Sequence, residues 1–320
     1  TEAQAIVRNV GLTSPFWAAP DYQETWMIPK HAFYATSGPM TDPGPYAASL
    51  DGLPTDVADL CRVVQGVMIH VFWADQYGVQ LTERRRAEVQ LRRVDRQLER
   101  LLALDSHPLA EARPPERRLV GNCRDFSVLL TTILRHQGVP ARARCGFGRY
   151  FIPGHYEDHW VAEVWDAAEQ RWRLVDAQMD ALQRAKLNLP FDPLDVPRDQ
   201  FIVGGKAWRM CRREGTDPDT FGIADLRGLW FVRGDFVRDV AALNKLELLP
   251  WDSWGLCEEP SGGLTDDHLV LLDHVADLTA VDTPDFDAVR AVYDSEAGFR
   301  VPSVITSYTQ AGPSEVDLAA

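Results

Sequence analysis

Three residues of the sequence have the types and contexts that cysteine chemistry requires, namely Cys123, His159 and Asp176. A thiol attacks a carbonyl as its thiolate, and its unperturbed pKa of about 8.5 falls at a helix N-terminus or beside an imidazolium. Cys123 opens the run CRDFSVLLTTILRHQG, whose apolar spacing predicts a helix with Asn122 as its N-cap. We therefore predict Cys123 as nucleophile, His159 as base and Asp176 as the acid that orients the imidazole.

The start of the same helix offers free backbone N–H groups to a carbonyl that develops negative charge, so the amide of Cys123 is one candidate oxyanion donor. A second donor is not evident, because the segment ERRLVGNC lacks a papain-type glutamine shortly before the cysteine. Gln65 and Trp73, on the preceding segment, are the candidates. Asp125 either favours the helix N-terminus or contacts the substrate.

The segments WVAEVW and RWRLVD predict two strands joined by a turn at residues 166–169. An antiparallel pairing that faces Val161 with Leu174 places His159 directly opposite Asp176. The Cβ atoms of such a pair lie roughly 4.5–5.5 Å apart. The carboxylate could then accept the imidazole N–H and fix the tautomer of the base.

Each of these residues has an ordinary structural explanation when taken alone, since buried cysteines pack, and histidines and aspartates flank many strands. Their order and context together favour catalysis. His155 lies close enough in sequence to compete with His159, and the remaining histidines lack a comparable partner. The three residues could in principle hold zinc, but a fourth ligand and the usual close spacing are missing, so we predict neither a metal nor a cofactor.

The runs GNCRDFSVLLTTILRHQGVPARARCGFGRYF and EDHWVAEVWDAAEQRWRLVDAQ resemble the core of bacterial transglutaminase-like proteins over about residues 119–179. The shared features are Gly-x-Cys at a helix start, the exit G-V-P-A-R, Asp-His with a Glu four residues later, and W-x-x-V-D. The resemblance implies a papain-like core and the same roles for Cys123, His159 and Asp176. One departure concerns the pocket wall, because the aromatic residue stands one place after the histidine, as Trp160, instead of two.

The leading functional hypothesis is acyl transfer from an amide or thioester through a thioester on Cys123, with an amine or water as acceptor. An amidase or peptidase could use the same residues, and a non-catalytic binding module could keep the fold without turnover. Arylamine acetyltransferases are disfavoured because the Arg-Gly-Gly-x-Cys signature is absent. The expected partner is a small-molecule or peptide amide or thioester, and the oligomeric state is left open.

The order of elements, a helix followed by successive strands without a βαβ rhythm, predicts an α+β fold with the nucleophile helix packed on an antiparallel sheet. A buried helix is expected from Thr55 to Gly78, and an amphipathic helix with a solvated, Arg-rich face over residues 83–104. Further helices are expected at residues 236–249 and 264–293. Four tryptophans are expected to pack, unless one or two line an acyl tunnel: Trp208, Trp230, Trp251 and Trp254.

We predict a single elaborated domain over residues 1–320. It would comprise an N-terminal wrapping arm without helices, a catalytic core, an extension and a loosely held tail: 1–52, 53–180, 181–300 and 301–320.

The composition is that of an ordinary globular protein, with 45% hydrophobic and 25% charged residues in a chain of 320. A formal charge of −14 would repel a phosphate backbone, which disfavours nucleic acid as a partner. The five cysteines include no CxxC pair, so no disulfide framework is expected. Without a membrane-spanning stretch or a signal-like order in residues 1–10, we expect a cytoplasmic protein that does not contact membranes.

Overall fold

The computed structural model describes residues 29–258, 263–309 and 311–319. Its centre is a six-stranded mixed sheet with the order β6-β3-β4-β7-β8, in which β5 pairs with β4 off this path. All neighbouring strands are antiparallel except β4 and β7, which are parallel. The strands are β3 Ala141–Gly148, β4 Tyr156–Asp166, β5 Arg171–Val175, β6 Phe201–Val203, β7 Phe221–Ile223 and β8 Leu226–Arg227.

Helix α5, Cys123–His136, packs against β3 and β4 and is buried over almost its whole length. Its apolar stripe lies in one core with residues of β4 and of helix α2, Val57–Val67. This stripe is the one that the sequence predicts: Phe126, Leu129, Leu130, Ile133 and Leu134. The expectation of an α+β fold with this helix packed on a sheet is therefore confirmed.

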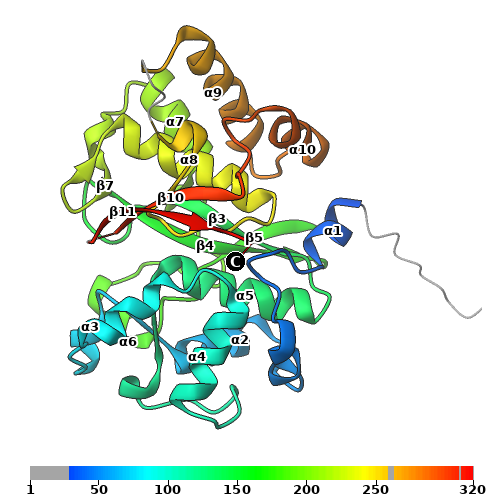
Figure 1. Ribbon diagram of the computed structural model, residues 1–320, viewed down its shortest axis with the longest axis vertical. Helices are drawn as coiled ribbons and strands as arrows, with labels where there is room; N and C mark the ends of the chain where they lie inside the picture. Colours follow the sequence, from blue (N-terminus) through cyan, green and yellow to red (C-terminus); the bar gives the residue numbers. More distant parts are fainter. Residues whose placement is uncertain (1–28, 259–262, 310, 320) are drawn as a thin grey trace, which may run out of the picture.

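A second group of helices covers the opposite side of the sheet, above the strands in Figure 1. It comprises α7 Gly204–Arg213, α8 Leu229–Leu243, α9 Asp266–Thr279 and α10 Phe286–Ser295. Helices α7 and α8 pack on β3, where Trp208, Phe236 and Phe147 belong to a second core. Within the described ranges, no helix is both long enough and apolar enough to cross a membrane.

The helix expected from Thr55 to Gly78 is shorter, and its N-cap is Asp56, whose side chain accepts hydrogen bonds from two amides of the first turn. The chain leaves α2 at Val67 and forms strand β1, Met68–His70, which pairs in parallel with β2, Leu119–Gly121. The residues after Val67 fit a buried helix or a buried strand equally well. The neighbouring strand decides between the two, because strand preference depends strongly on context.

The amphipathic helix expected over residues 83–104 is interrupted before Val94. An extended Leu91 follows the 3-10 helix Ala87–Gln90, and the N–H of Val94 donates to the carbonyl of Met40. The arginine face is not wholly solvated either, since Arg92 forms an ion pair of 2.7 Å with the buried Asp252. The elements observed are α3 Glu83–Arg86, the 3-10 helix Ala87–Gln90 and α4 Val94–Leu104.

Both terminal segments contain more structure than expected. In the described part of the N-terminal arm, Pro29–Tyr34 forms α1 and Gly44–Leu50 forms a 3-10 helix, while residues 1–28 lie outside the described residues. The tail forms a hairpin of β10, Val304–Thr309, and β11, Gly312–Asp317, which pairs with β9, Asp252–Ser253. The prediction of a loosely held tail is therefore wrong, because the short strand β9 gives it a hydrogen-bonding partner.

Glu163 on β4 is the centre of a buried ion network beside the site. Its carboxylate accepts hydrogen bonds from Arg142 at 2.6 Å, Arg144 at 3.0 Å and Arg198 at 2.9 Å. Burial alone would raise the pKa of Glu163, but the three guanidinium groups outweigh it and hold the pKa well below its usual range. Arg144 also pairs with Asp239 of α8, so the network ties the sheet to that helix.

We expect Glu163→Gln to lower the free energy of unfolding by about 3–5 kcal/mol, because it leaves the buried guanidinium of Arg142 without its charge partner and that of Arg144 with Asp239 alone. Urea unfolding monitored by circular dichroism would measure the loss. Glu169→Gln is the matched control, since Glu169 forms an exposed pair with Arg171 that should contribute about 0–1 kcal/mol. Equal losses in the two variants would contradict a structural role for the network.

Candidate active site

Cys123 is the first residue of α5, at the end of a short strand that leads directly into the helix. The side chain of Asn122 accepts a hydrogen bond from the amide of Asp125, and the carboxylate of Asp125 accepts one from the amide of Asn122. This reciprocal capping box fixes the first turn, and the position of Cys123 in that turn gives its amide no carbonyl to bond within the helix. Asp125 also binds Arg124 and Gln97, so it is a capping residue and does not line the cavity described below.

His159 lies within β4, and its Nε2 is 2.8 Å from Oδ2 of Asp176, with both side chains almost fully buried. The same carboxylate accepts the hydroxyl of Tyr150 at 2.7 Å and the backbone N–H of Gln178 at 3.1 Å. His155 does not compete with His159 for Asp176, because its ring is near Glu157 and the carbonyl of Gly222. The predicted pairing of imidazole and carboxylate is therefore present.

The predicted register of this hairpin is wrong by two residues. Leu174 faces Glu163 and not Val161, so continuing the pairing places Asp176 diagonally from His159. A shift of two residues keeps every side chain on its face of the sheet, whereas a shift of one would not. Diagonal neighbours lie roughly 7–8 Å apart, within reach of a long side chain such as histidine, so the hydrogen bond forms nonetheless.

Three aromatic rings surround the imidazole of His159. Phe151, Tyr150 and Phe201 meet it edge-on, with ring centroids 4.8, 5.8 and 6.3 Å away. Such packing restricts the ring to one orientation and excludes water from the bond to Asp176.

A cavity of about 660 Å³ joins Cys123 and His159, a size typical of small-molecule sites. Trp73 lines it as expected, but Gln65 does not, because its amide donates to the carbonyl of Ala177 at 3.1 Å. Trp160 is wholly buried beside Cys123 in a small apolar cluster and forms no part of the cavity wall.

The four tryptophans singled out in the sequence lie in different environments. Trp251 lines the cavity, and its indole N–H donates to Gln90 at 2.9 Å. Trp208 and Trp254 are buried in the second core, and Trp230 is 52% exposed. One of the four therefore contributes to the pocket, and two pack as expected.

Burial raises the pKa of the Cys123 thiol well above its ordinary value, and the charge of Asp158 raises it further. A hydrogen bond from the Trp160 amide acts in the opposite direction without cancelling the rise. The sequence predicts a lowered pKa from the position at a helix start, but desolvation of this buried group outweighs the helix dipole. The resting thiol is therefore protonated at neutral pH.

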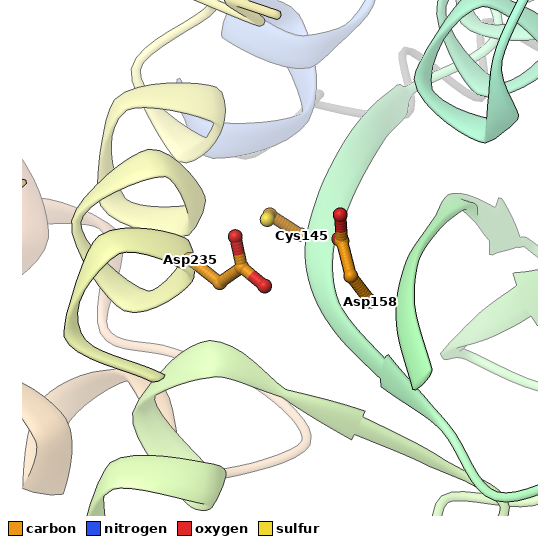
Figure 2. Close-up of side chains that lie close together, drawn as sticks. All are labelled: Cys145, Asp158 and Asp235. Carbon is orange, nitrogen blue, oxygen red and sulfur yellow. The ribbon is translucent and has the colours of Figure 1, made fainter. Parts of the chain in front are cut away.

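A buried cluster adjoins the thiol, where Figure 2 shows Cys145 and Asp158 of the sheet facing Asp235 of α8. One potential ligand atom from each of the three lies within 4.8 Å of the others. One oxygen of Asp158 and one of Asp235 have no hydrogen-bond partner among the residues that the structure describes. These groups could hold a cation, but the described residues offer three ligands where a closed zinc site has four, and Arg238 already pairs with Asp235 at 3.0 Å.

The cluster is better described as a carboxyl pair that retains a proton. Burial raises the pKa of Asp235 to about 7, with Arg238 opposing the rise. Burial and the neighbouring Asp235 also raise the pKa of Asp158. One carboxyl can then donate a hydrogen bond to the other. A single shared proton thus reduces the electrostatic cost of burying two adjacent acidic groups.

We expect Asp235→Asn to weaken the dependence of stability on pH. Between the ordinary aspartate pKa of about 3.9 and the folded value, the native state binds more protons than the unfolded chain, so stability falls as pH rises through this window. An asparagine can donate to Asp158 and accept from Arg238 without titrating. The fall in melting temperature from pH 5 to pH 8 should be smaller in this variant than in the unaltered protein.

Asp225→Asn is the control for that comparison, since Asp225 is exposed. An equal fall in melting temperature for the Asp235 variant and the unaltered protein would exclude a shared proton in this pair.

Sequence reasoning missed several residues of the site, including Tyr150, Asp158, Gln178 and His70. Asp158 and Gln178 stand one residue before His159 and two after Asp176, so adjacency was the available signal. The tail residues Tyr308 and Thr309 line the cavity, and Tyr150 binds Asp176. All three depend on contacts with distant parts of the sequence and had no local signal.

A thiol at a helix start that shares a cavity with a buried imidazole–carboxylate pair is the arrangement of a papain-like cysteine site. Residues 101–177 match the family model of the transglutaminase-like superfamily, which supports the resemblance noted in the sequence. The match includes Cys123, His159 and Asp176. Neither the curated proteins nor the solved structures that were compared include a match to this chain. This match suggests cysteine-based acyl transfer or hydrolysis.

Proposed function

We propose that Cys123 attacks an amide or thioester carbonyl, carries the acyl group as a thioester and passes it to an amine or to water. The observation that best supports this proposal is the buried 2.8 Å hydrogen bond between His159 and Asp176, in the wall of the cavity that Cys123 shares.

Asp176 fixes the tautomer of the base. Because its carboxylate accepts the proton on Nε2 of His159, the other ring nitrogen, Nδ1, is free to take a proton from the thiol. The hydroxyl of Tyr150 and the amide of Gln178 hold the carboxylate in place. The imidazolium that forms during the reaction then lies against a negative charge.

Acylation moves the thiol proton first to His159 and then to the leaving group. The sulfur of Cys123 forms a bond to the carbonyl carbon while its proton moves to Nδ1 of His159, and the carbonyl oxygen becomes an oxyanion. When the carbonyl reforms, the bond to the leaving amine or thiol breaks and the leaving group takes the proton from His159. The acceptor reverses the sequence with an N–H or O–H in place of the thiol.

The protonated resting state of Cys123 fits a mechanism in which proton removal accompanies attack. A thiolate–imidazolium pair would place two charges in a site from which water is largely excluded, at a desolvation cost that neutral partners avoid. His159 would act as a general base at the moment of attack.

The acceptor decides between a transferase and a hydrolase of the amidase or peptidase type, since both use the same acyl-enzyme. Glu157 and Asp158 line the cavity, and the negative charge that the Asp158–Asp235 pair keeps beside its single proton is close enough to Cys123 to raise the pKa of the thiol. They would attract a cationic amine, which favours transfer. A non-catalytic binding module is supported less well, because it gives no reason to bury an imidazole–carboxylate pair beside a thiol.

We expect the protein to acquire one acetyl group on Cys123 when it is incubated with p-nitrophenyl acetate, an activated acyl donor. Mass spectrometry of the intact protein and of its peptides would locate the adduct. Cys123→Ala should abolish it, whereas Cys211→Ala, which removes a partly exposed thiol, should keep it. Acetylation that survives Cys123→Ala would rule out this nucleophile.

Asp176→Asn should slow acetylation by about 10²–10⁴-fold, because the asparagine amide leaves the imidazole in the wrong tautomer or orientation. Tyr150→Phe is the matched control, since it removes one hydrogen bond from the same oxygen but keeps the carboxylate and its bond to His159. It should therefore slow acetylation less, by about 1.5–3 kcal/mol at most, the range for a hydrogen bond to a charged group. Stopped-flow release of p-nitrophenol measures both. If Asp176→Asn acted no more strongly than Tyr150→Phe, Asp176 would not orient the base.

A further inference from the structure

His70 lies beside the nucleophile although 53 positions of sequence separate it from Cys123. The parallel pairing of β1 with β2 sets His70 opposite Gly121, two residues before Cys123. The side chain is 6% exposed and lines the same cavity as Cys123 and His159. Paired strands lie about 4.8 Å apart, so this register brings the imidazole to the start of α5.

A backbone hydrogen bond selects the tautomer of His70. Its Nδ1 accepts the N–H of Phe72 at 3.2 Å, so the proton of a neutral ring must reside on Nε2. Within the described part of the chain, no carbonyl or side chain accepts that Nε2 proton. His70 therefore brings an N–H donor to the cavity that lacks a protein acceptor.

The ring also remains neutral across the physiological range. Burial lowers the pKa of His70 to about 3, and a proton on His159 would lower it further, against a smaller opposing effect of Asp176. A ring that does not titrate and whose Nδ1 is already occupied cannot act as a base. The function left to it is hydrogen-bond donation, a role in which a neutral imidazole is effective.

We propose that Nε2–H of His70 is the second oxyanion donor of the site, acting with the backbone amide of Cys123 on the carbonyl oxygen of the substrate. This inference rests on the proposed acyl transfer. It supplies the second oxyanion donor that could not be identified from the sequence. Among the earlier candidates, Gln65 uses its amide on Ala177, and Trp73 shares the cavity but is not set beside Gly121 by the strand pairing.

The step involves no proton transfer from His70. As the Cys123 sulfur bonds to the carbonyl carbon, the π electrons of the carbonyl move to oxygen, and Nε2–H and the Cys123 amide donate hydrogen bonds to it. When the carbonyl reforms and the leaving group departs, both donors keep their protons. Donors of this kind act mainly on the transition state, so their loss lowers kcat more than it raises KM.

Asn122 offers a competing donor, so the test must distinguish it from His70. Its Nδ2 is buried, has no hydrogen-bond partner within the described ranges and belongs to a residue that lines the cavity. Its Oδ1 is committed to capping α5. Asn122→Ser would keep a capping oxygen and replace the Nδ2 donor by the hydroxyl of a shorter side chain.

The test compares two reactions of the same thiol. Acetylation by p-nitrophenyl acetate passes through an oxyanion, whereas alkylation by iodoacetamide at pH 9 does not. We expect His70→Leu to reduce the acetylation rate about 10²–10³-fold while the alkylation rate stays within about threefold, the margin expected if the thiol itself is unchanged. His70→Gln, which restores an N–H donor, should recover at least a tenth of the acetylation rate.

Several results would overturn the proposal. Equal losses of acetylation and alkylation in His70→Leu would mean that His70 only supports the fold or the thiol. An unchanged acetylation rate, or a larger loss in Asn122→Ser than in His70→Leu, would exclude His70 as the donor. Acetylation that persists in Cys123→Ala would instead defeat the proposed function itself, so the two failures remain distinguishable.

Discussion

The carboxylate of Asp176 is the group on which the arrangement of the site depends. A buried charge is costly unless donors surround it, and Asp176 receives three, from His159, Tyr150 and the amide of Gln178. These donors belong to β4, to the segment after β3 and to the segment after β5. The same contacts that compensate the charge therefore hold the three segments in register, and the base acquires its tautomer as a consequence.

The chemistry of the site was more predictable from sequence than its geometry. The helix start at Cys123, its Asn122 cap and the partnership of His159 with Asp176 follow from residue types and local order. The hairpin register was wrong by two residues because both registers place the same side chains on the same face, so the alternating pattern cannot choose between them. The hydrogen bond survived the error because histidine is long enough to reach a diagonal neighbour.

Features that depend on distant pairings could not be predicted in this way. Strand β1 is three residues long and buried, so it has no alternation, and only its partner β2 makes it a strand. His70 appeared to lack a partner for the same reason. The thiol illustrates a related limit, because a helix start can be recognised in a sequence while the extent of desolvation around it cannot.

The C-terminal hairpin gives the cavity a wall from the far end of the chain. Tyr308 and Thr309 of β10 line the same space as Cys123, yet they take no part in the hydrogen bonds that orient the base. The residues that would perform the reaction and some of those that shape the bound molecule are thus encoded well apart. Changes confined to this hairpin would alter the shape of the cavity while leaving the reactive groups intact, so the choice of bound molecule and the chemistry can vary separately.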